Sequence, residues 1–160
     1  MAVDMFMLID GIKGESKDKT HKEAIDVLAW SWSLSNSGSF HTGGGGGSGK
    51  VSVQDLSFTK YVDKASADLQ LACCNGKHLK NAKLIVRKSG EKPLEYIIIE
   101  LTECLVTAVS TGGTGGEDRL VENLTLNFSK VHFEYKIQDE KGAGKDGGQY
   151  TWDVSGNTKG

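Results

Sequence analysis

Proline, cysteine and long apolar runs are all scarce in this sequence. The 160 residues include one proline and three cysteines, and no stretch approaches the roughly 18 apolar residues that a membrane-spanning helix needs. The cysteines form an odd set without CxxC spacing, so neither a disulfide framework nor a zinc site is indicated. The first residues, 1–4, lack the basic and apolar regions of a cleaved signal peptide. We therefore expect folding in a reducing cytoplasm, without membrane insertion.

An excess of charge of either sign is also missing. Lys and Arg number 19 against 21 Asp and Glu, a formal net charge of -2. This balance excludes the basic footprint of a nucleic-acid-binding protein and a polybasic membrane patch. With 38% hydrophobic and 25% charged residues, the chain is not typical of a disordered protein. Its length fits one domain with one hydrophobic core, spanning 1–160.

Alternating apolar residues predict mostly β-structure. We expect strands at 3–9, 51–58 and 82–88 and a central strand at 94–109 that is apolar on both faces. In two further strands, 25–34 and 124–135, the apolar residues change parity partway. A β-bulge, placed near 27–29 in the first of them, reverses which side chains face inward and so explains such a change. Repeated changes of this kind indicate strongly curved strands.

One segment has helical rather than alternating spacing. Apolar residues between Val62 and Cys73 recur along one helical face, and Asn75-Gly76 supplies a left-handed stop. The 21 glycines and single proline favour glycine-built turns between strands. The predicted fold is mainly β, a curved β-sandwich or barrel of about seven strands with one flanking α-helix.

Three polar segments are expected to be loops, and a fourth is expected to be a tail. They are a charged loop at 10–22, a flexible glycine-rich loop at about 36–50, and a third loop at 110–118. The C-terminal residues, about 139–160, read as a polar tail in which only Tyr150, Trp152 and Val154 are strand-like.

A phosphate-binding motif is matched by letter only. Residues 44–50 satisfy GxxxxGK, and Gly44, Gly46 and Gly49 satisfy GxGxxG. A P-loop also needs Ser or Thr after the lysine and a helix after the loop. Here Val51 follows, and residues 51–54 alternate as a strand does. A plain glycine-rich loop is favoured, and no nucleotide or other cofactor is expected.

No constellation of catalytic or metal-binding residues is apparent. The four histidines are scattered without the i, i+4 spacing of a metal motif: His21, His41, His78 and His132. Glu100 and Glu103 suggest a pair of glycosidase carboxylates, but outward positions or salt bridges explain them better. We expect no enzymatic activity and no bound metal.

Several segments, read in order along the chain, carry a resemblance. They are Met1–Phe6, Asp10–Ser16, Leu28-Ala29-Trp30-Ser31-Trp32, the Gly43–Lys50 loop, Val53–Lys60, Gly76-Lys77-His78, Ser110–Gly113 and Gly116–Arg119. Together they resemble the haemolysin-coregulated protein (Hcp) family of bacterial type VI secretion systems, over nearly the whole chain.

The resemblance implies a role as a structural subunit. Members assemble as six-membered rings that stack into the inner tube of a contractile injection apparatus, with a sheath around the tube and a spike on it. The tube protein leaves the bacterial cytoplasm without a cleaved signal peptide, and effector proteins travel in its lumen. The expected partners are therefore further copies of this chain, the sheath, the spike and effectors.

Two site hypotheses accompany this resemblance. A closed ring uses two different faces of each subunit, and a mobile chain with few side chains can become ordered between stacked rings. The expected ring-stacking loop is Gly43, Gly44, Gly45, Gly46, Gly47, Ser48, Gly49 and Lys50. The expected lumen or effector contact is Thr111, Gly112, Gly113 and Thr114, where small neutral residues let cargo pass without sticking.

Two alternatives come from other functional classes. Trp30 and Trp32, two residues apart on one strand face, would suit a monomeric β-sandwich module that binds a ligand or carbohydrate, although packing in the core is the favoured role. A nucleotide-dependent enzyme is the weaker alternative. Solution mass separates a ring from a monomeric module.

Overall fold

A computed structural model describes residues 2–38, 40 and 49–160 of the chain. It contains these elements: β1 Val3–Ile9, β2 Ile25–Asp26, β3 Ala29–Ser31, β4 Leu34–Ser35, β5 Ser52–Val53, β6 Leu56–Tyr61, α1 Ser66–Asn75, β7 Leu79–Lys88, β8 Leu94–Gly112, β9 Val121–Gln138, β10 Gly144–Asp153 and β11 Thr158–Lys159. Within these ranges no helix is long and apolar enough to cross a membrane.

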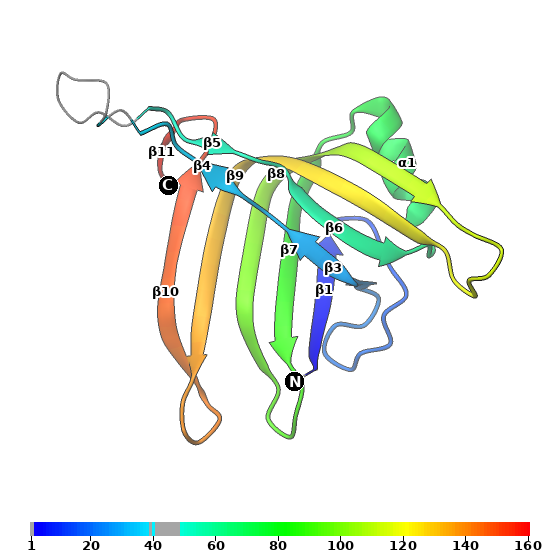
Figure 1. Cartoon of the computed structure of the whole chain (residues 1–160), viewed down its shortest axis with the longest axis horizontal. Coiled ribbons are helices and arrows are strands. Elements are labelled where there is room, and N and C mark those ends of the chain that lie inside the picture. The colour runs from blue at the N-terminus through cyan, green and yellow to red at the C-terminus, as the bar shows by residue number, and fades with distance from the viewer. Residues whose placement is uncertain (1, 39, 41–48) are drawn as a thin grey trace.

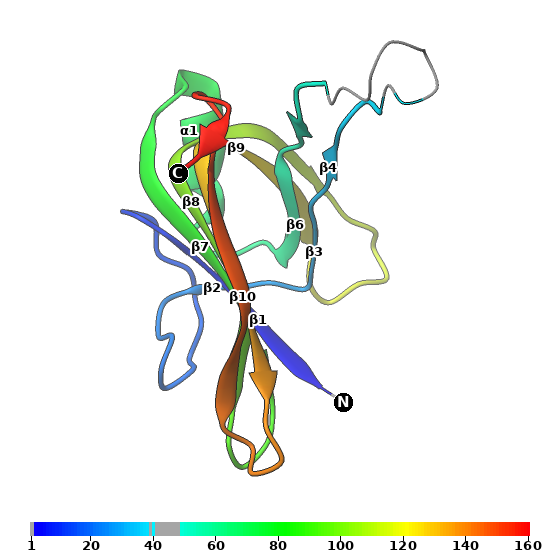
Figure 2. The same ribbon diagram turned by 90° about the vertical axis from the view of Figure 1, so that its left-hand side faces the viewer.

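Two long strands, β8 and β9, belong to both layers of the fold. They pair antiparallel from Ile97↔Tyr135 to Gly112↔Val121. One edge of β9 carries β6 along its first half and β10 along its second half. The lower layer continues from β8 through β7 to β1, and the upper layer continues from β6 to β3. The predicted mainly-β, curved fold with one helix is confirmed (Figures 1 and 2), although the nine-stranded sheet does not close into a barrel.

The buried core lies between these two layers. Its largest fully buried apolar side chains come from both layers and from the helix, and they are Met7, Ile25, Leu56, Phe58, Leu69, Leu84, Ile99, Leu101, Leu124 and Leu126. Burial of such side chains is the main favourable contribution to folding.

A crease crosses three neighbouring strands at one register. On β8, Leu101 and Cys104 are buried, whereas the two residues between them are exposed, and Glu103 has a positive φ of 52°. Two buried residues three positions apart also occur at 79 and 82 on β7 and at 128 and 131 on β9. These positions pair with Cys104 and Leu101 of β8. The predicted parity change in 124–135 is confirmed. The crease lets β8 and β9 turn from one layer into the other.

The single strand expected at 25–34 is wrong. The segment forms three short strands that pair with three different partners: β2 with β1, β3 with β6, and β4 with β5. The parity change arises because the chain crosses from the lower layer to the upper one between Asp26 and Ala29. Tertiary pairing here divides what the alternation alone presents as one strand.

The helix ends where the sequence predicts. Gly76 has φ 64°, and its backbone N–H donates to the carbonyl of Ala72. The helix begins at Ser66 rather than near Val62, because the side chain of Asp63 accepts the backbone N–H of Ala65 at 2.9 Å and so forms a turn first. Helix α1 packs beside β8 and leaves its outer side to solvent (Figure 1).

The C-terminal segment 139–160 differs from a polar tail. Strand β10 pairs with β9 over nearly its whole length, with an irregularity between Asp146 and Gly148, and β11 pairs with its end. Gly148 adopts φ 127° there. Backbone hydrogen bonds hold residues that have few apolar side chains, so alternation revealed only Tyr150 and Trp152.

Candidate functional site

The upper layer presents a face made of small, uncharged side chains. Its four strands run in the order β3, β6, β9 and β8. Two rows of paired residues cross it, Ala29–Thr59–Asn123–Ser110 and Ser31–Ser57–Thr125–Ala108. We refer to these eight residues as the small-residue face.

Alternation explains why this face is polar while its reverse is apolar. Successive residues of a strand point to opposite sides. Phe58 and Leu124 lie between the small residues in sequence and are buried in the core. Trp30 lies between Ala29 and Ser31 and packs against the same core. The face therefore offers short hydroxyl, amide and methyl groups on a rigid sheet.

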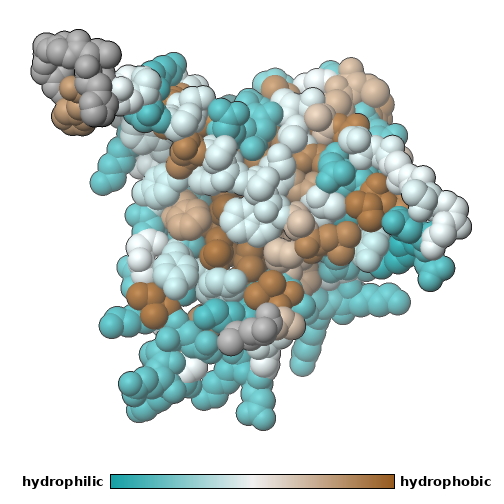
Figure 3. Space-filling view, in the orientation of Figure 1, coloured by the Kyte–Doolittle hydropathy of each residue, from teal (hydrophilic) through white to brown (hydrophobic). Residues whose placement is uncertain are grey.

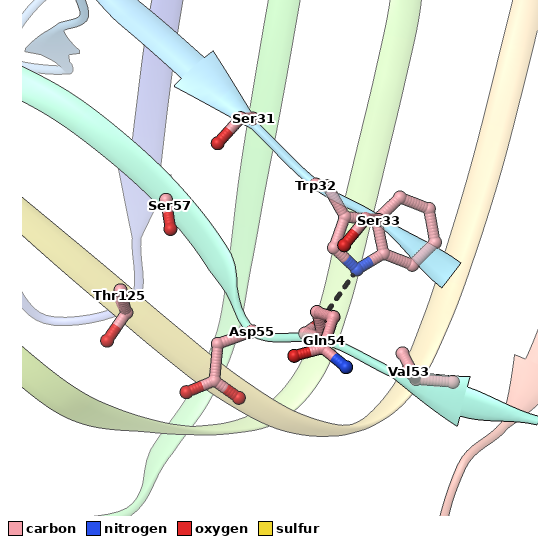
Figure 4. Close-up of a pocket in the computed structure, with 8 residues that line it drawn as sticks. All are labelled: Ser31, Trp32, Ser33, Val53, Gln54, Asp55, Ser57 and Thr125. Carbon is pink, nitrogen blue, oxygen red and sulfur yellow. Dashed lines mark hydrogen bonds between the residues drawn. The ribbon is translucent and has the colours of Figure 1, made fainter. Parts of the chain in front are cut away.

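The face is hollowed next to β5 (Figure 4). The hollow is lined by Ser31, Trp32, Ser33, Val53, Gln54, Asp55, Ser57 and Thr125. The indole N–H of Trp32 donates to the Gln54 carbonyl at 2.9 Å. The carboxylate of Asp55 accepts hydrogen bonds from Thr107 Oγ1 at 2.6 Å and Asn127 Nδ2 at 2.9 Å. The carboxylate at the edge of the hollow is therefore bonded to one residue of β8 and one of β9.

The tryptophans do not form an open binding platform. Trp30 and Trp32 are half-buried and pack against the core. The Trp32 ring meets Phe128 edge-on, with 6.3 Å between ring centroids. The favoured core-packing role is confirmed for both. In the view of Figure 3, apolar residues lie among residues of intermediate hydropathy across the middle of this side, and the most hydrophilic residues lie mostly toward its edges.

A buried ion pair lies on the reverse of the face. Lys60 on β6 pairs with Glu122 on β9, and both side chains are 0% exposed. The Lys60 Nζ atom is 2.5 Å from Glu122 Oε1 and 2.8 Å from Asp63 Oδ1. Ser66 Oγ donates to Glu122 at 2.6 Å, and Thr111 Oγ1 donates at 3.3 Å. The cluster therefore ties β6, β9, the end of β8 and the start of α1 together.

Hydrogen bonding determines the charge of Glu122. Burial would raise the pKa of its carboxyl group, but hydrogen bonds from Lys60 and Ser66 hold the pKa below the ordinary value. The group is thus a carboxylate at neutral pH. Sequence reasoning missed this pair. The available signal was that Lys60 and Glu122 each occupy a position that alternation along their strand assigns to the buried side.

The predicted lumen residues occupy the end of the β8–β9 hairpin. Thr111 points toward Glu122, on the reverse of the small-residue face, and Gly112 pairs with Val121. A side chain at Gly113 would meet Leu120, since an ideal Cβ lies 2.1 Å from its Cδ2. The Thr114 carbonyl accepts the Glu117 N–H at 3.3 Å in the turn. These four residues thus adjoin one end of the face and are not part of its two rows.

Most of the predicted stacking loop lies outside the described residues, namely Gly43 to Ser48. Gly49 donates its backbone N–H to the Ser37 carbonyl at 3.2 Å, and Lys50 is exposed. The loop leads into strand β5, not into a helix, which agrees with the rejection of a P-loop.

The remaining candidates are separated in space or paired structurally. Glu100 forms an exposed ion pair with Lys83 at 3.3 Å, as expected of an outward residue. His21 contacts Glu95, and His132 Nδ1 lies 2.7 Å from Thr151 Oγ1. Across the described part of the chain, no three His, Cys, Asp or Glu residues gather as metal ligands would.

Comparison with known proteins gives consistent matches. A family model described as "Type VI secretion system effector, Hcp" matches residues 6–135. "Protein hcp1" of Pseudomonas aeruginosa is 65% identical over 162 residues, covering 99% of each chain. A solved "Structure of a type six secretion system protein" has a TM-score of 0.93 and 30% identity, covering 99% of this chain and 100% of its own. The crystal structure of Hcp1 from Salmonella typhimurium has a TM-score of 0.79 and 35% identity, covering 99% of each chain.

Proposed function

This chain belongs to the Hcp family of type VI secretion effectors, and from that premise we propose that it is a structural subunit of rings that stack into the secretion tube. Six copies close each ring, and the small-residue face lines the lumen. The protein acts by shape and passage of cargo, without bond-making chemistry. It is exported with the tube and carries effectors in the lumen.

The small-residue face is the observation that carries the proposal. Its eight side chains are short and uncharged, so it lacks the large apolar or charged groups that would hold a passing protein tightly. The buried Lys60–Glu122 pair joins β6 and β9 behind the face, and the apolar core packs against the same side. A wall of this kind suits a channel more than a pocket for one ligand.

Open strand edges offer surfaces for contacts between copies of the chain. Within the described ranges, β3 pairs only with β6, and β8 pairs with no strand on its second side beyond Cys104. A ring requires that one side of each subunit meet a different side of the next. These two edges lie on opposite sides of the small-residue face, so the chain offers further copies more than one side to contact.

The two earlier site hypotheses keep their places in this proposal. Thr111 to Thr114 lie at the hairpin end of β8, where they would form the rim of the lumen. The segment Gly43 to Lys50 would contact the next ring of the stack. Deleting Gly44 to Gly47 is expected to leave single rings intact and to stop tube growth, as seen by electron microscopy; normal tubes from the deletion would reject this role.

One pair of substitutions tests the lumen assignment. Ala29 lies on the small-residue face, and Ala67 is exposed on α1. Ala29→Arg is expected to preserve the ring mass while reducing the amount of effector that co-purifies with it and is exported. Ala67→Arg is the matched control and is expected to leave both unchanged. Equal effector binding and export by the two variants would show that the face does not line the lumen.

A further inference from the structure

An apolar groove lies along one flank of the molecule, between the β4–β5 ribbon and strand β10. It is lined entirely by apolar and aromatic side chains and encloses about 220 Å³: Leu34, Val51, Val53, Val131, Tyr150 and Trp152. Leu34 is 47% exposed, and the indole Nε1 of Trp152 is buried without a hydrogen-bond partner in the described structure. Exposed apolar surface of this kind usually marks a contact.

A complementary apolar projection lies on the opposite flank. Leu120 is 45% exposed at the turn that joins β8 to β9, and Val62 beside it is 39% exposed. The backbone N–H of Val62 donates to the Leu120 carbonyl at 2.9 Å, which holds the two residues together. In Figure 1 the β8–β9 turn lies at the far right, whereas β10 and the β4–β5 ribbon lie at the left.

Charges beside the projection and the groove have opposite signs. Glu117 and Asp118 precede Leu120 and are exposed. Arg119, between them and Leu120, holds its guanidinium over the ring of Tyr61, 3.8 Å from the ring centroid, and remains positively charged. Two carboxylates against one guanidinium leave the rim of the projection with a net negative charge.

The groove has basic residues at its rim. Lys50 precedes Val51, and Lys159 pairs directly with Trp152 across β11 and β10, so it lies on the same side of the sheet. The nearby carboxylate of Asp153 accepts hydrogen bonds from Ser155 Oγ at 2.8 Å and the Gly156 N–H at 2.9 Å and stays negatively charged, so the two lysines leave the rim with a net positive charge. Complementary charges of this kind orient a contact and speed its formation.

We infer that the Leu120–Val62 projection of one copy inserts into the Leu34–Trp152 groove of the next copy and so forms the subunit contact that closes the ring. The inference rests on the proposed ring. It identifies two different surfaces on opposite flanks, which is the arrangement that a closed ring requires. The apolar side chains fill the groove, and Glu117 and Asp118 approach Lys159 at its rim.

Two single substitutions test the contact by solution mass, measured by light scattering after size-exclusion chromatography. Leu120→Glu and Leu34→Glu each place a charge in the contact and are expected to weaken it by a factor on the order of 100, leaving single chains of 17.2 kDa. Leu71→Glu is the matched control, because Leu71 is 60% exposed on α1 and belongs to neither the projection nor the groove. This control is expected to keep the mass of the unsubstituted protein. Circular dichroism checks that all three variants are folded.

Mixing the two defective variants gives the most specific outcome. The Leu34→Glu chain retains an intact projection, and the Leu120→Glu chain retains an intact groove. One contact can form between them and no ring can close, so the mixture is expected to contain particles of two chains. Failure of the mixture to pair, or a Leu120→Glu variant that keeps the full ring mass, overturns the inference while leaving the ring intact. An unsubstituted protein that stays a single chain removes the proposed ring itself.

Discussion

Replacing Lys60, whose side chain is fully buried, with methionine is expected to destabilise the fold strongly. Methionine replaces the unbranched apolar stem of lysine but removes the charged ammonium group that lies 2.5 Å from Glu122 and 2.8 Å from Asp63. Both Lys60 and Glu122 are 0% exposed. Removing one partner of such a buried pair lowers the free energy of unfolding by about 3–5 kcal/mol, because the remaining charge is left without compensation.

The double variant Lys60→Met/Glu122→Leu separates this reasoning from a simple packing defect. It removes both charges of this pair, and Asp63 still accepts the backbone N–H of Ala65, so the double variant is expected to recover most of the lost stability. Lys83→Met is the surface control, since Lys83 and Glu100 form an ion pair in which the side chains are 41% and 49% exposed. That substitution is expected to change the free energy of unfolding by less than about 1 kcal/mol.

Urea unfolding at one fixed protein concentration provides the measurement, because self-association adds to apparent stability. The pH dependence has a definite sign. The pKa of Glu122 is lowered in the folded state, so its contribution is present above the ordinary glutamate pKa of about 4.3 and is lost as the pH falls through the lower folded value. The double variant is expected to lose this component. A Lys60→Met variant as stable as the Lys83→Met control would refute the reasoning.

Three further predictions concern single features. Gly76→Ala forces a side chain onto a left-handed residue with φ 64° and is expected to lower the free energy of unfolding by about 1–2 kcal/mol in the same urea assay, so an unchanged midpoint would contradict it. In the folded chain the guanidinium of Arg87 donates a hydrogen bond of 2.6 Å to Asp18 and lowers the pKa of that carboxyl group. Arg87→Met removes this group, so backbone hydrogen exchange in the loop around Asp18 is expected to become faster. Unchanged protection of that loop would argue against an anchoring role for Arg87. Burial raises the pKa of the Cys104 thiol to about 12, whereas Cys74 is exposed. Mass spectrometry after alkylation at pH 8 is therefore expected to find Cys74 modified first and Cys104 last, and the reverse order would contradict this prediction.

Alternation predicted the parts of the fold in which one face of a strand is buried throughout. The predicted strand at 3–9 matches β1, and the parity change in 124–135 corresponds to the crease in β9. Strand β10 was not predicted, because its first six residues are all exposed and its pairing depends on backbone hydrogen bonds. The break of 25–34 into three strands also could not be read from the chain, since it depends on which distant strand lies beside each piece.

The candidate site was only partly predictable for a similar reason. Small residues at 110–114 are visible as a cluster in the sequence, whereas the small-residue face joins short runs from four separate strands. Their common face follows from register, and register depends on tertiary pairing. The Lys60–Glu122 pair was missed because an isolated charged residue in a strand is usually solvent-exposed.

The mass of the unsubstituted protein in solution tests the ring most directly. Light scattering coupled to size-exclusion chromatography is expected to give six times the 17.2 kDa of one chain, and negative-stain micrographs are expected to show annular particles with an open centre. A mass of one chain at high protein concentration, with no annular particles, would contradict the proposal that this protein works as a hollow ring.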